Sequence, residues 1–193
     1  LKGEEDLVIY GSSKVGKSFL LQSICNYFSE ANKSSLYIPL KELNSHETGL
    51  LDNLEKLNLV CIDDLEIIAG DNKWETAIFN LINDCLLSSC RIVFCSNINP
   101  SLISFQLRDL FSRIQKINQM EVFPVKSDNL AEAVRFFADL RSINIGDKEI
   151  AYLINHSKRS MGDLITNINQ LDKLSMQLKR KITIPLIKKV TEN

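Results

Sequence analysis

The sequence lacks the features of a membrane protein and of a protein that binds nucleic acid through its overall charge. No apolar run approaches the roughly 20 residues needed to cross a bilayer, and no signal peptide is recognisable. The net charge is −1. Because binding to a nucleic-acid backbone usually requires a basic excess, autonomous DNA binding is not favoured, although a local basic patch is compatible with this charge.

The sequence also lacks a zinc-site pattern. It has five cysteines but no C-x-x-C pair, and its only two histidines, His46 and His156, are far from them in sequence. Most of the cysteines fall inside apolar runs, where a thiol behaves as a small hydrophobic side chain. We therefore expect reduced cysteines in a cytoplasmic protein: Cys25, Cys61, Cys85, Cys90 and Cys95.

An initiator methionine is also lacking. The chain begins at Leu1, almost directly before the first expected strand, so we expect that an N-terminal piece is missing. At 193 residues, the chain is long enough for one domain with a small appendage.

The strongest signal that is present is the motif G-x-x-x-x-G-K-[ST] at residues 11–18, the P-loop. Its glycines let the backbone wrap around a phosphate, so that the amide groups and the dipole of the following helix face the anion. Lys17 is expected to reach the β- and γ-phosphates, and the Ser18 hydroxyl to complete a magnesium shell. The nucleotide-binding residues are expected to be Gly11, Ser12, Ser13, Lys14, Val15, Gly16, Lys17, Ser18 and Phe19.

An ordinary glycine- and serine-rich turn with a stray lysine is the alternative interpretation of this motif. The flanking sequence argues against that alternative. Residues 7–10 form a short apolar, β-rich run, and Phe19, Leu20 and Ile24 follow at helical spacing. Strand, loop and helix in this order is the arrangement that the motif requires.

Downstream, apolar β-rich runs alternate with amphipathic stretches, which predicts a parallel sheet with crossover helices. The expected fold class is therefore α/β: a P-loop domain with a five-stranded parallel sheet over residues 1–126. A proline at the end of the last strand suggests an edge strand or a strand end. The expected strands are 7–10, 35–39, 59–62, 91–96 and 120–124, and the helices after the P-loop helix are 47–57, 74–86 and 106–114.

From Ser127 the β-pattern disappears, and residues 127–193 are expected to form a small all-helical lid domain. Asp147 is expected to cap the second lid helix, and Ser160 with Asp163 to form the capping box of the third. The expected lid helices are 128–140, 147–156, 160–178 and a short one after Thr183.

Polar side chains follow two of the expected strands, and ligands gather beyond the carboxyl ends of parallel strands. Asp63 is expected to hold Mg²⁺, usually through water, and Asp64 to orient or activate the attacking water. Asn97 can hydrogen-bond the γ-phosphate or that water. Taken alone, the two aspartates also fit a solvated turn, and Arg108 and Arg113 fit ordinary surface positions.

Together these features resemble an AAA+ ATPase of the DnaA branch and, within it, the Hda-type regulators of the bacterial initiator. The likeness spans nearly the whole chain. The YIPLKEL and IDDLEIIAGD-x-x-WE parts are specific, whereas the P-loop alone indicates only a nucleotide triphosphatase. The resemblance is carried by the segments LYIPLKEL, VCIDDLEIIAGDNKWETAIFNLIN, LRDLFSRI and LDKLSMQLKRKITIPLIKKV.

The resemblance implies a role for each matching residue. Residues 11–18 correspond to Walker A, Asp63 and Asp64 to Walker B, Asn97 to sensor 1 and Arg113 to the arginine finger of box VII. Such a finger acts in trans, here on ATP held by DnaA. The implied cofactors are ADP or ATP with Mg²⁺, and the chain would be a weak ATPase or an ATPase activator. The implied partners are DnaA, the DNA polymerase sliding clamp and, through head-to-tail contacts, further copies of the chain.

The chain departs from the family pattern at two places. The sensor 2 arginine would fall at Gly162, and Arg159, three residues earlier, is a candidate substitute. The family's clamp-binding motif is not found in this chain, so we expect the clamp contact in an N-terminal segment outside it. The DNA-binding domain of DnaA is not found after the lid, which favours a regulator over the initiator.

Two other functions stay open. The first is a DNA-associated adaptor of the helicase-loader kind, whose binding to DNA would fall steeply with salt. The second is a small-molecule P-loop kinase. The near-neutral charge disfavours the first, and the DnaA-like lid disfavours the second.

Overall fold

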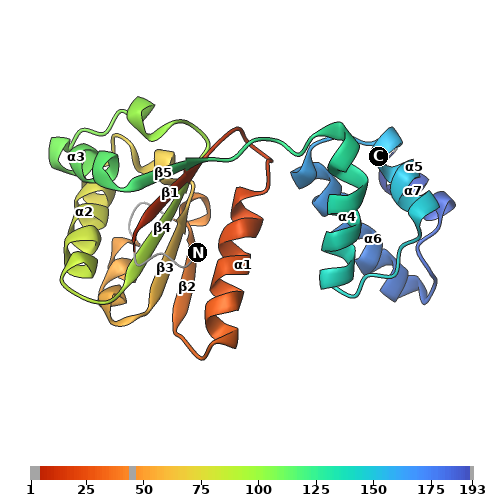
Figure 1. The fold of residues 1–193 in the computed structure, drawn as a ribbon, viewed down its shortest axis with the longest axis horizontal. Coiled ribbons are helices and arrows are strands. Elements are labelled where there is room, and N and C mark those ends of the chain that lie inside the picture. Colours follow the sequence, from red (N-terminus) through yellow and green to blue (C-terminus); the bar gives the residue numbers. More distant parts are fainter. Residues whose placement is uncertain (1–4, 44–46, 192–193) are drawn as a thin grey trace. The chain divides into compact units, whose positions relative to one another are not determined.

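The computed structural model describes residues 5–43 and 47–191. The chain forms two compact units (Figure 1). The first comprises the residues up to Ser13 and Lys17–Val122, and the second comprises Lys14–Gly16 and the residues from Phe123 onward. The tip of the P-loop therefore groups with the C-terminal unit.

The first unit contains a five-stranded sheet in the order β2-β3-β4-β1-β5, with every neighbouring pair parallel. The predicted fold class is confirmed. The strands are β1 (Leu7–Tyr10), β2 (Ser35–Pro39), β3 (Leu59–Asp63), β4 (Arg91–Ser96) and β5 (Asn118–Glu121). The helices are α1 (Lys17–Glu30), α2 (Asn72–Leu86) and α3 (Arg108–Lys116). Short 3₁₀ turns connect them: η1 (Leu40–Glu42), η2 (Thr48–Leu51), η3 (Leu54–Lys56), η4 (Leu65–Ile68) and η5 (Pro100–Leu102).

Alternate side chains of the strands enter two different cores, one on each face of the sheet. Leu7 and Ile9 of β1 pack with Leu21 and Ile24 of α1. Val8, between them, belongs to the larger core, which contains side chains of α2 and α3. Helices therefore cover both faces of the sheet (Figure 1). This double burial explains why β3 and β4 are almost continuously apolar in sequence.

The helix predicted over residues 47–57 is wrong. The turns η2 and η3 occupy this stretch. Between them Asp52 is extended (φ −71°, ψ 136°) and Asn53 is left-handed (φ 64°), so the backbone leaves helical geometry. Leu51 and Leu54 are buried at a spacing that imitates a helix, while Gly49 lowers helix propensity.

The last strand begins two residues before its predicted span of 120–124. In the described part of the chain it pairs only with β1, so it is an edge strand, as Pro124 suggests. All four residues of β5 are exposed. A polar edge strand does not produce the apolar run by which strands are recognised in a sequence.

The second unit is helical, and the predicted lid helices are confirmed. Its buried core includes Leu130, Val134, Phe137, Ile150, Leu153, Leu164, Ile168, Leu171 and Ile187. A short turn, η6 (Ser127–Asn129), precedes α4 (Leu130–Leu140), α5 (Asp147–His156), α6 (Met161–Leu178) and α7 (Ile184–Thr191).

The caps of the lid helices were predicted with mixed success. Ser160 caps α6, and its Oγ accepts a hydrogen bond from the Asp163 amide at 3.1 Å. The predicted cap of α5 is wrong, because Asp147 is the first helical residue and Gly146 holds the cap position. The Asp147 carboxylate instead pairs with Arg135 of α4.

Several absences expected from the sequence can be compared with the structure. No helix within residues 5–43 and 47–191 is long and apolar enough to span a membrane. The five cysteines are free thiols. In the described part of the chain, no group of three or more His, Cys, Asp or Glu side chains is arranged to hold a metal ion. His46 lies outside the described residues.

Candidate functional site

The P-loop connects the end of β1 to the start of α1. The Gly11 amide donates to the Ser96 carbonyl at the end of β4 (3.3 Å). A Cβ atom on Gly11 would lie 2.2 Å from the Val122 carbonyl oxygen, so a larger residue would displace the backbone. Gly16 has φ 105°, a conformation that L side chains rarely adopt. Both glycines of the motif are therefore required by the path of the loop.

Lys17 is buried at the base of this loop, with only 5% of its surface exposed. Its ammonium group donates to the carbonyls of Gly11 (3.0 Å) and Ser12 (2.9 Å) and to Asn97 Oδ1 (2.9 Å). Burial lowers the pKa of Lys17, and neighbouring acidic side chains, among them Asp63, oppose that shift. An ammonium group has three N–H donors, and all are used here. A phosphate entering the loop would therefore have to take over some of these bonds.

Asp63 ends β3 and is almost fully buried (2% exposed). Its Oδ2 accepts a hydrogen bond from the Tyr37 hydroxyl (2.8 Å), and its Oδ1 accepts one from the Asp64 amide (3.0 Å). Burial, followed by the bond to Asp63, raises the pKa of Tyr37 well above its usual value. Tyr37 therefore remains a neutral donor that holds the carboxylate. Sequence reasoning missed Tyr37, although a hydroxyl in the strand before the Asp-ending strand was an available signal.

Asn97, directly after β4, links Lys17 to the acidic residues that follow β3. Its side-chain amide donates to Asp64 Oδ1 (2.9 Å) and to Glu66 Oε1 (2.6 Å). Its backbone amide donates to Glu66 Oε2 (3.1 Å). Burial and the neighbouring carboxylates of Asp63 and Glu66 raise the pKa of Asp64. Asp64 is left-handed (φ 58°), which turns the chain into η4.

The structure thus brings the predicted residues Lys17, Asp63, Asp64 and Asn97 into one hydrogen-bonded cluster. Sequence reasoning missed Glu66, which holds Asn97 with both carboxylate oxygens. The available signal was the third acidic residue of the Asp-Asp-Leu-Glu run. Only the turn after β3 directs that side chain back to Asn97.

The Ser18 hydroxyl and the Asp63 carboxylate are the donors expected for Mg²⁺. Ser18 is exposed in the first turn of α1. Mg²⁺ usually takes one or two carboxylates together with substrate phosphates and water. A hydroxyl and one carboxylate beside a phosphate-binding loop are therefore a donor set that fits a magnesium–nucleotide complex.

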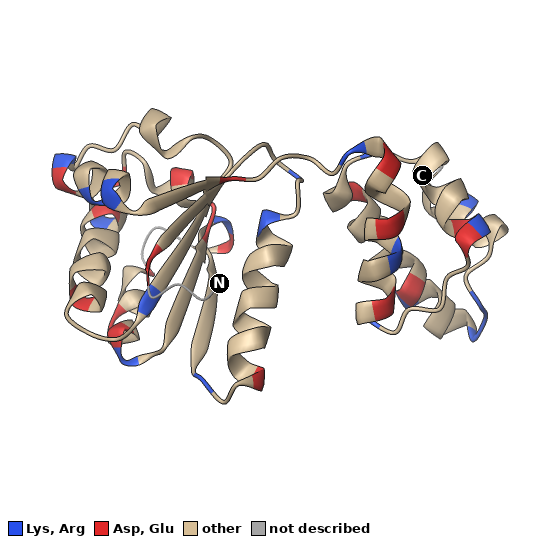
Figure 2. Ribbon diagram, viewed as in Figure 1, with Lys and Arg blue, Asp and Glu red and all other residues tan. Residues whose placement is uncertain are grey.

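The two arginines singled out in the sequence lie on α3. Arg113 is half-buried in the last turn, and Arg108 is exposed at the first helical residue. The basic residues of this helix are visible in Figure 2. Among the described residues, neither arginine side chain forms an ion pair or a hydrogen bond. The structure therefore does not join them to the Lys17 cluster.

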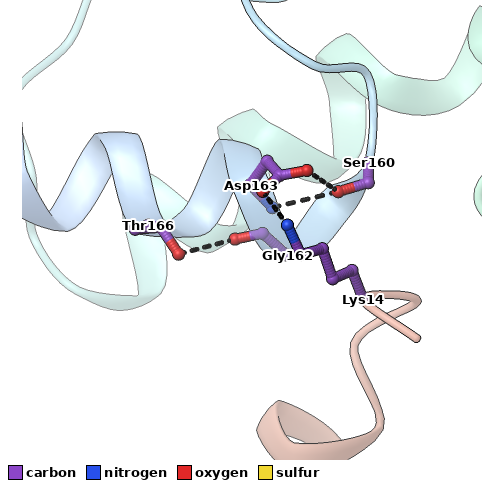
Figure 3. A network of polar contacts seen from close by, with 5 residues as sticks. All are labelled: Lys14, Ser160, Gly162, Asp163 and Thr166. Atoms are coloured by element: carbon purple, nitrogen blue, oxygen red, sulfur yellow. Dashed lines mark hydrogen bonds and ion pairs between the residues drawn. The ribbon is translucent and has the colours of Figure 1, made fainter. Parts of the chain in front are cut away.

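Within the second unit, the tip of the P-loop contacts the start of α6 (Figure 3). The Gly162 amide donates to the Lys14 carbonyl (2.9 Å), and Lys14 Nζ pairs with Asp163 (2.6 Å). The hydrogen bonds from Lys14 and then from the Ser160 hydroxyl hold the pKa of Asp163 below its usual value. A Cβ atom on Gly162 would lie 2.9 Å from Lys14 Cβ, so this close approach suits glycine.

The expected sensor 2 position therefore makes a backbone contact in this chain. Arg159, the candidate substitute, is exposed, and its Nη2 donates to Asn155 Oδ1 of α5 (3.5 Å). In the part of the chain that the structure describes, Arg159 has no polar contact with Lys14–Gly16.

Comparison with protein families identifies the two parts of the chain. Residues 3–119 match the bacterial DnaA ATPase domain, and residues 127–191 match the lid domain of Hda. The chain belongs to the DnaA-related, Hda-type AAA+ proteins. An uncharacterized protein of Haemophilus influenzae is 32% identical to this Hda-type chain over 183 residues, which are 94% of the chain and 79% of that protein.

Solved structures share the fold of this Hda-type protein. Domain III of the replication initiation protein DnaA from Thermotoga maritima has a TM-score of 0.75 at 22% identity, covering 97% of this chain and 83% of that one. AMPPCP-bound DnaA from Aquifex aeolicus has a TM-score of 0.65 at 20% identity, covering 91% and 57%. The Holliday junction branch migration motor RuvB of Thermotoga maritima has a TM-score of 0.63 at 17% identity, covering 97% and 61%.

Proposed function

We propose that this chain is a nucleotide-binding regulator that contacts the initiator DnaA and stimulates hydrolysis of DnaA-bound ATP. Its membership of the Hda-type family supports the contact with DnaA. The P-loop geometry and the buried Lys17 support binding of ADP or ATP with Mg²⁺. The structural neighbour DnaA of Aquifex aeolicus is bound to AMPPCP, which supports an adenine nucleotide as the ligand.

In this proposal the P-loop amides and Lys17 hold the phosphates. Lys17 exchanges carbonyl acceptors for phosphate oxygens, and Ser18 and Asp63 hold Mg²⁺, whose charge offsets that of the phosphates. Asn97 positions the γ-phosphate or a water molecule. Asp64, whose raised pKa brings it closer to that of a useful base, orients this water.

Arg113 is the residue that carries the regulatory part of the proposal. It is half-buried on a helix, and among the described residues its guanidinium group has no polar partner. A guanidinium group without an acceptor among the described residues is available to an anion supplied by another molecule. We take that anion to be the phosphoryl group transferred from DnaA-bound ATP. The sliding clamp on DNA would bring the two proteins together.

Turnover of DnaA-bound ATP in the presence of clamp-loaded DNA tests this proposal. We expect Arg113→Ala to lower the stimulated rate by roughly 10³-fold, because arginine fingers contribute about 10³–10⁵. Arg108→Ala is the matched control, since it removes the same charge from an exposed position of the same helix. Its rate is expected to stay within about threefold of wild type.

Equal rates for wild type and Arg113→Ala would remove the finger assignment. Similar losses for both arginine variants would point to a general effect of charge. The DNA-associated adaptor would give a third pattern: Arg113→Ala would be neutral, and binding to single-stranded DNA would weaken steeply with salt.

A further inference from the structure

Glu75, in the first turn of α2, is fully buried although its side chain is acidic (0% exposed). Its Oε1 accepts hydrogen bonds from the amides of Gly70 (2.7 Å) and Gln106 (3.1 Å), and its Oε2 accepts one from the Leu107 amide (2.7 Å). Within residues 5–43 and 47–191, no lysine or arginine pairs with this carboxylate. Because a buried carboxylate must replace its lost hydration, these three backbone amides are what hold it in the core.

Two of the three donors lie directly before α3. In a capping box, a glutamate side chain of the same helix binds the amide of the cap residue. Here the cap residue of α3 is Leu107, which makes no side-chain capping bond, and the glutamate comes from α2 instead. A negative charge at this end is also favoured by the dipole of α3. Glu75 therefore fixes the start of α3 from a neighbouring helix.

The third donor ties the same carboxylate to the loop after β3. Gly70 has φ 90° and follows η4, the turn that begins directly after Asp64 and carries Glu66. Glu75 thus connects the segment after the Asp-Asp pair to the segment before α3. Arg113 lies six residues beyond Leu107, about 9 Å along a helix axis, so its position follows from that of the helix start.

We propose that Glu75 is the positioning residue of the arginine finger: its buried carboxylate fixes the start of α3 and thereby sets where Arg113 is presented. This inference rests on the proposed function of Arg113. A misplacement of about 1 Å can lower a rate by roughly 10²-fold. Glu75 therefore acts on the rate at which DnaA-bound ATP is hydrolysed, rather than on the affinity for DnaA.

The test compares wild type with Glu75→Gln, which keeps the size of the side chain but turns an N–H donor toward a backbone donor. We expect the rate of hydrolysis at saturation to fall by about 10- to 100-fold, with the half-saturating concentration of the protein unchanged within about threefold. The amides of residues 106–110 should exchange faster with deuterium. In an Arg113→Ala background, Glu75→Gln should lower the rate by less than about twofold, because the finger is already gone.

Asp71→Ala is the matched stability control. Asp71 caps the same helix and accepts hydrogen bonds from the amides of Lys73 and Trp74, so its removal weakens the start of α2 but removes none of the three hydrogen bonds that the Glu75 carboxylate accepts. Its rate at saturation should stay within about threefold of wild type. The proposal is overturned if Asp71→Ala lowers this rate as much as Glu75→Gln does, or if Glu75→Gln keeps the full rate.

Two further measurements keep the test decisive. Glu75→Asp retains the charge on a shorter side chain, so its rate of hydrolysis at saturation should lie below that of wild type. This variant replaces Glu75→Gln in the test if Glu75→Gln does not fold. Hydrogen exchange of the wild-type protein is the second measurement. If the amides of Gln106 and Leu107 exchange as fast as those of an unfolded chain, they are not bonded to Glu75, and the proposal is overturned. An Arg113→Ala variant with a normal rate would instead contradict the arginine-finger assignment. A failure of the Glu75 proposal can therefore be distinguished from a failure of the proposed function.

Discussion

Two lysines three residues apart in the P-loop lie in opposite environments. Lys17 is 5% exposed and donates three hydrogen bonds. The side chain of Lys14 is 53% exposed and pairs with the single carboxylate of Asp163. The first belongs to the core of the α/β unit, and the second lies on the surface of the helical unit. The same charged group is therefore used in two different ways.

The difference shows which of these charges is suited to bind a ligand. An ion pair on the surface contributes about 0–1 kcal/mol, because water competes for both partners. A buried ammonium group has already lost its water, and its attraction to an anion is stronger in a medium of low dielectric constant. Lys17 therefore fits a phosphate-binding role, whereas Lys14 fits a local contact with α6.

The largest effect is expected for Lys17→Ala. With saturating ADP or ATP and Mg²⁺, wild type should melt roughly 5–10 °C higher than without nucleotide, since ligand at 100 times Kd stabilises by about 2.7 kcal/mol. Lys17→Ala should show no such increase. Differential scanning fluorimetry of both proteins, with and without nucleotide, measures this difference.

Lys14→Ala is the matched control, because it removes the same charge three residues earlier in the loop. It should keep at least half of the nucleotide-dependent increase in melting temperature. An equal loss in both variants would erase the distinction between the two lysines. A full increase in Lys17→Ala would show that this ammonium group does not bind the phosphates.

The fold and the Lys17 cluster were predictable because they depend on simple periodicities. Apolar runs of β-rich residues separated by helical stretches indicate a parallel sheet, and the carboxyl ends of such strands meet at one edge. Asp63 ends β3 and Asn97 follows β4, and these strands are neighbours in the sheet, so their approach to the P-loop could be anticipated. Glu66 and Tyr37 could not be placed in the same way, since one depends on a tight turn and the other on the pairing of β2 with β3.

Errors arose where a local pattern had two structural solutions. Leu51 and Leu54 have the spacing of a helix, but Asn53 adopts a left-handed conformation and separates two 3₁₀ turns. Asp147 resembles a helix cap, but it is the first helical residue, and its carboxylate pairs with Arg135. In both cases tertiary contacts, which a single sequence does not display, decide between the solutions.

A smaller effect, of opposite sign, is expected for Asp64→Asn. Burial and the carboxylates of Asp63 and Glu66 raise the pKa of Asp64 in the folded protein. The folded state therefore loses stability as the pH rises from the unfolded pKa of about 3.9 through the raised folded value. Asn cannot ionise, so Asp64→Asn should melt roughly 1–4 °C above wild type at pH 7, without nucleotide, and show no gain below about pH 4.

The control for this measurement is Asp139→Asn, which removes an aspartate from an exposed position of α4. Its melting temperature should stay within about 1 °C of wild type at pH 7. A gain of the same size in both variants would mean that net charge, rather than the crowded carboxylates around Lys17, limits stability.

The smallest effect is expected for Asp163→Asn, which tests the surface side of the comparison. Lys14 and then Ser160 hold the pKa of Asp163 below its usual value, so the pair stabilises the protein above the unfolded pKa and is lost as the pH falls through the lowered folded value. Asn keeps the hydrogen bond from Ser160 but not the ion pair with Lys14. We therefore expect a decrease in melting temperature of no more than about 2 °C at pH 7 in low salt.

The decrease should vanish in 1 M NaCl, where charges are screened beyond about 3 Å, and also below about pH 3. A decrease that persists in high salt would mean that the contact between the P-loop tip and α6 is packed and desolvated like that of Lys17, and the contrast between the two lysines would then fail.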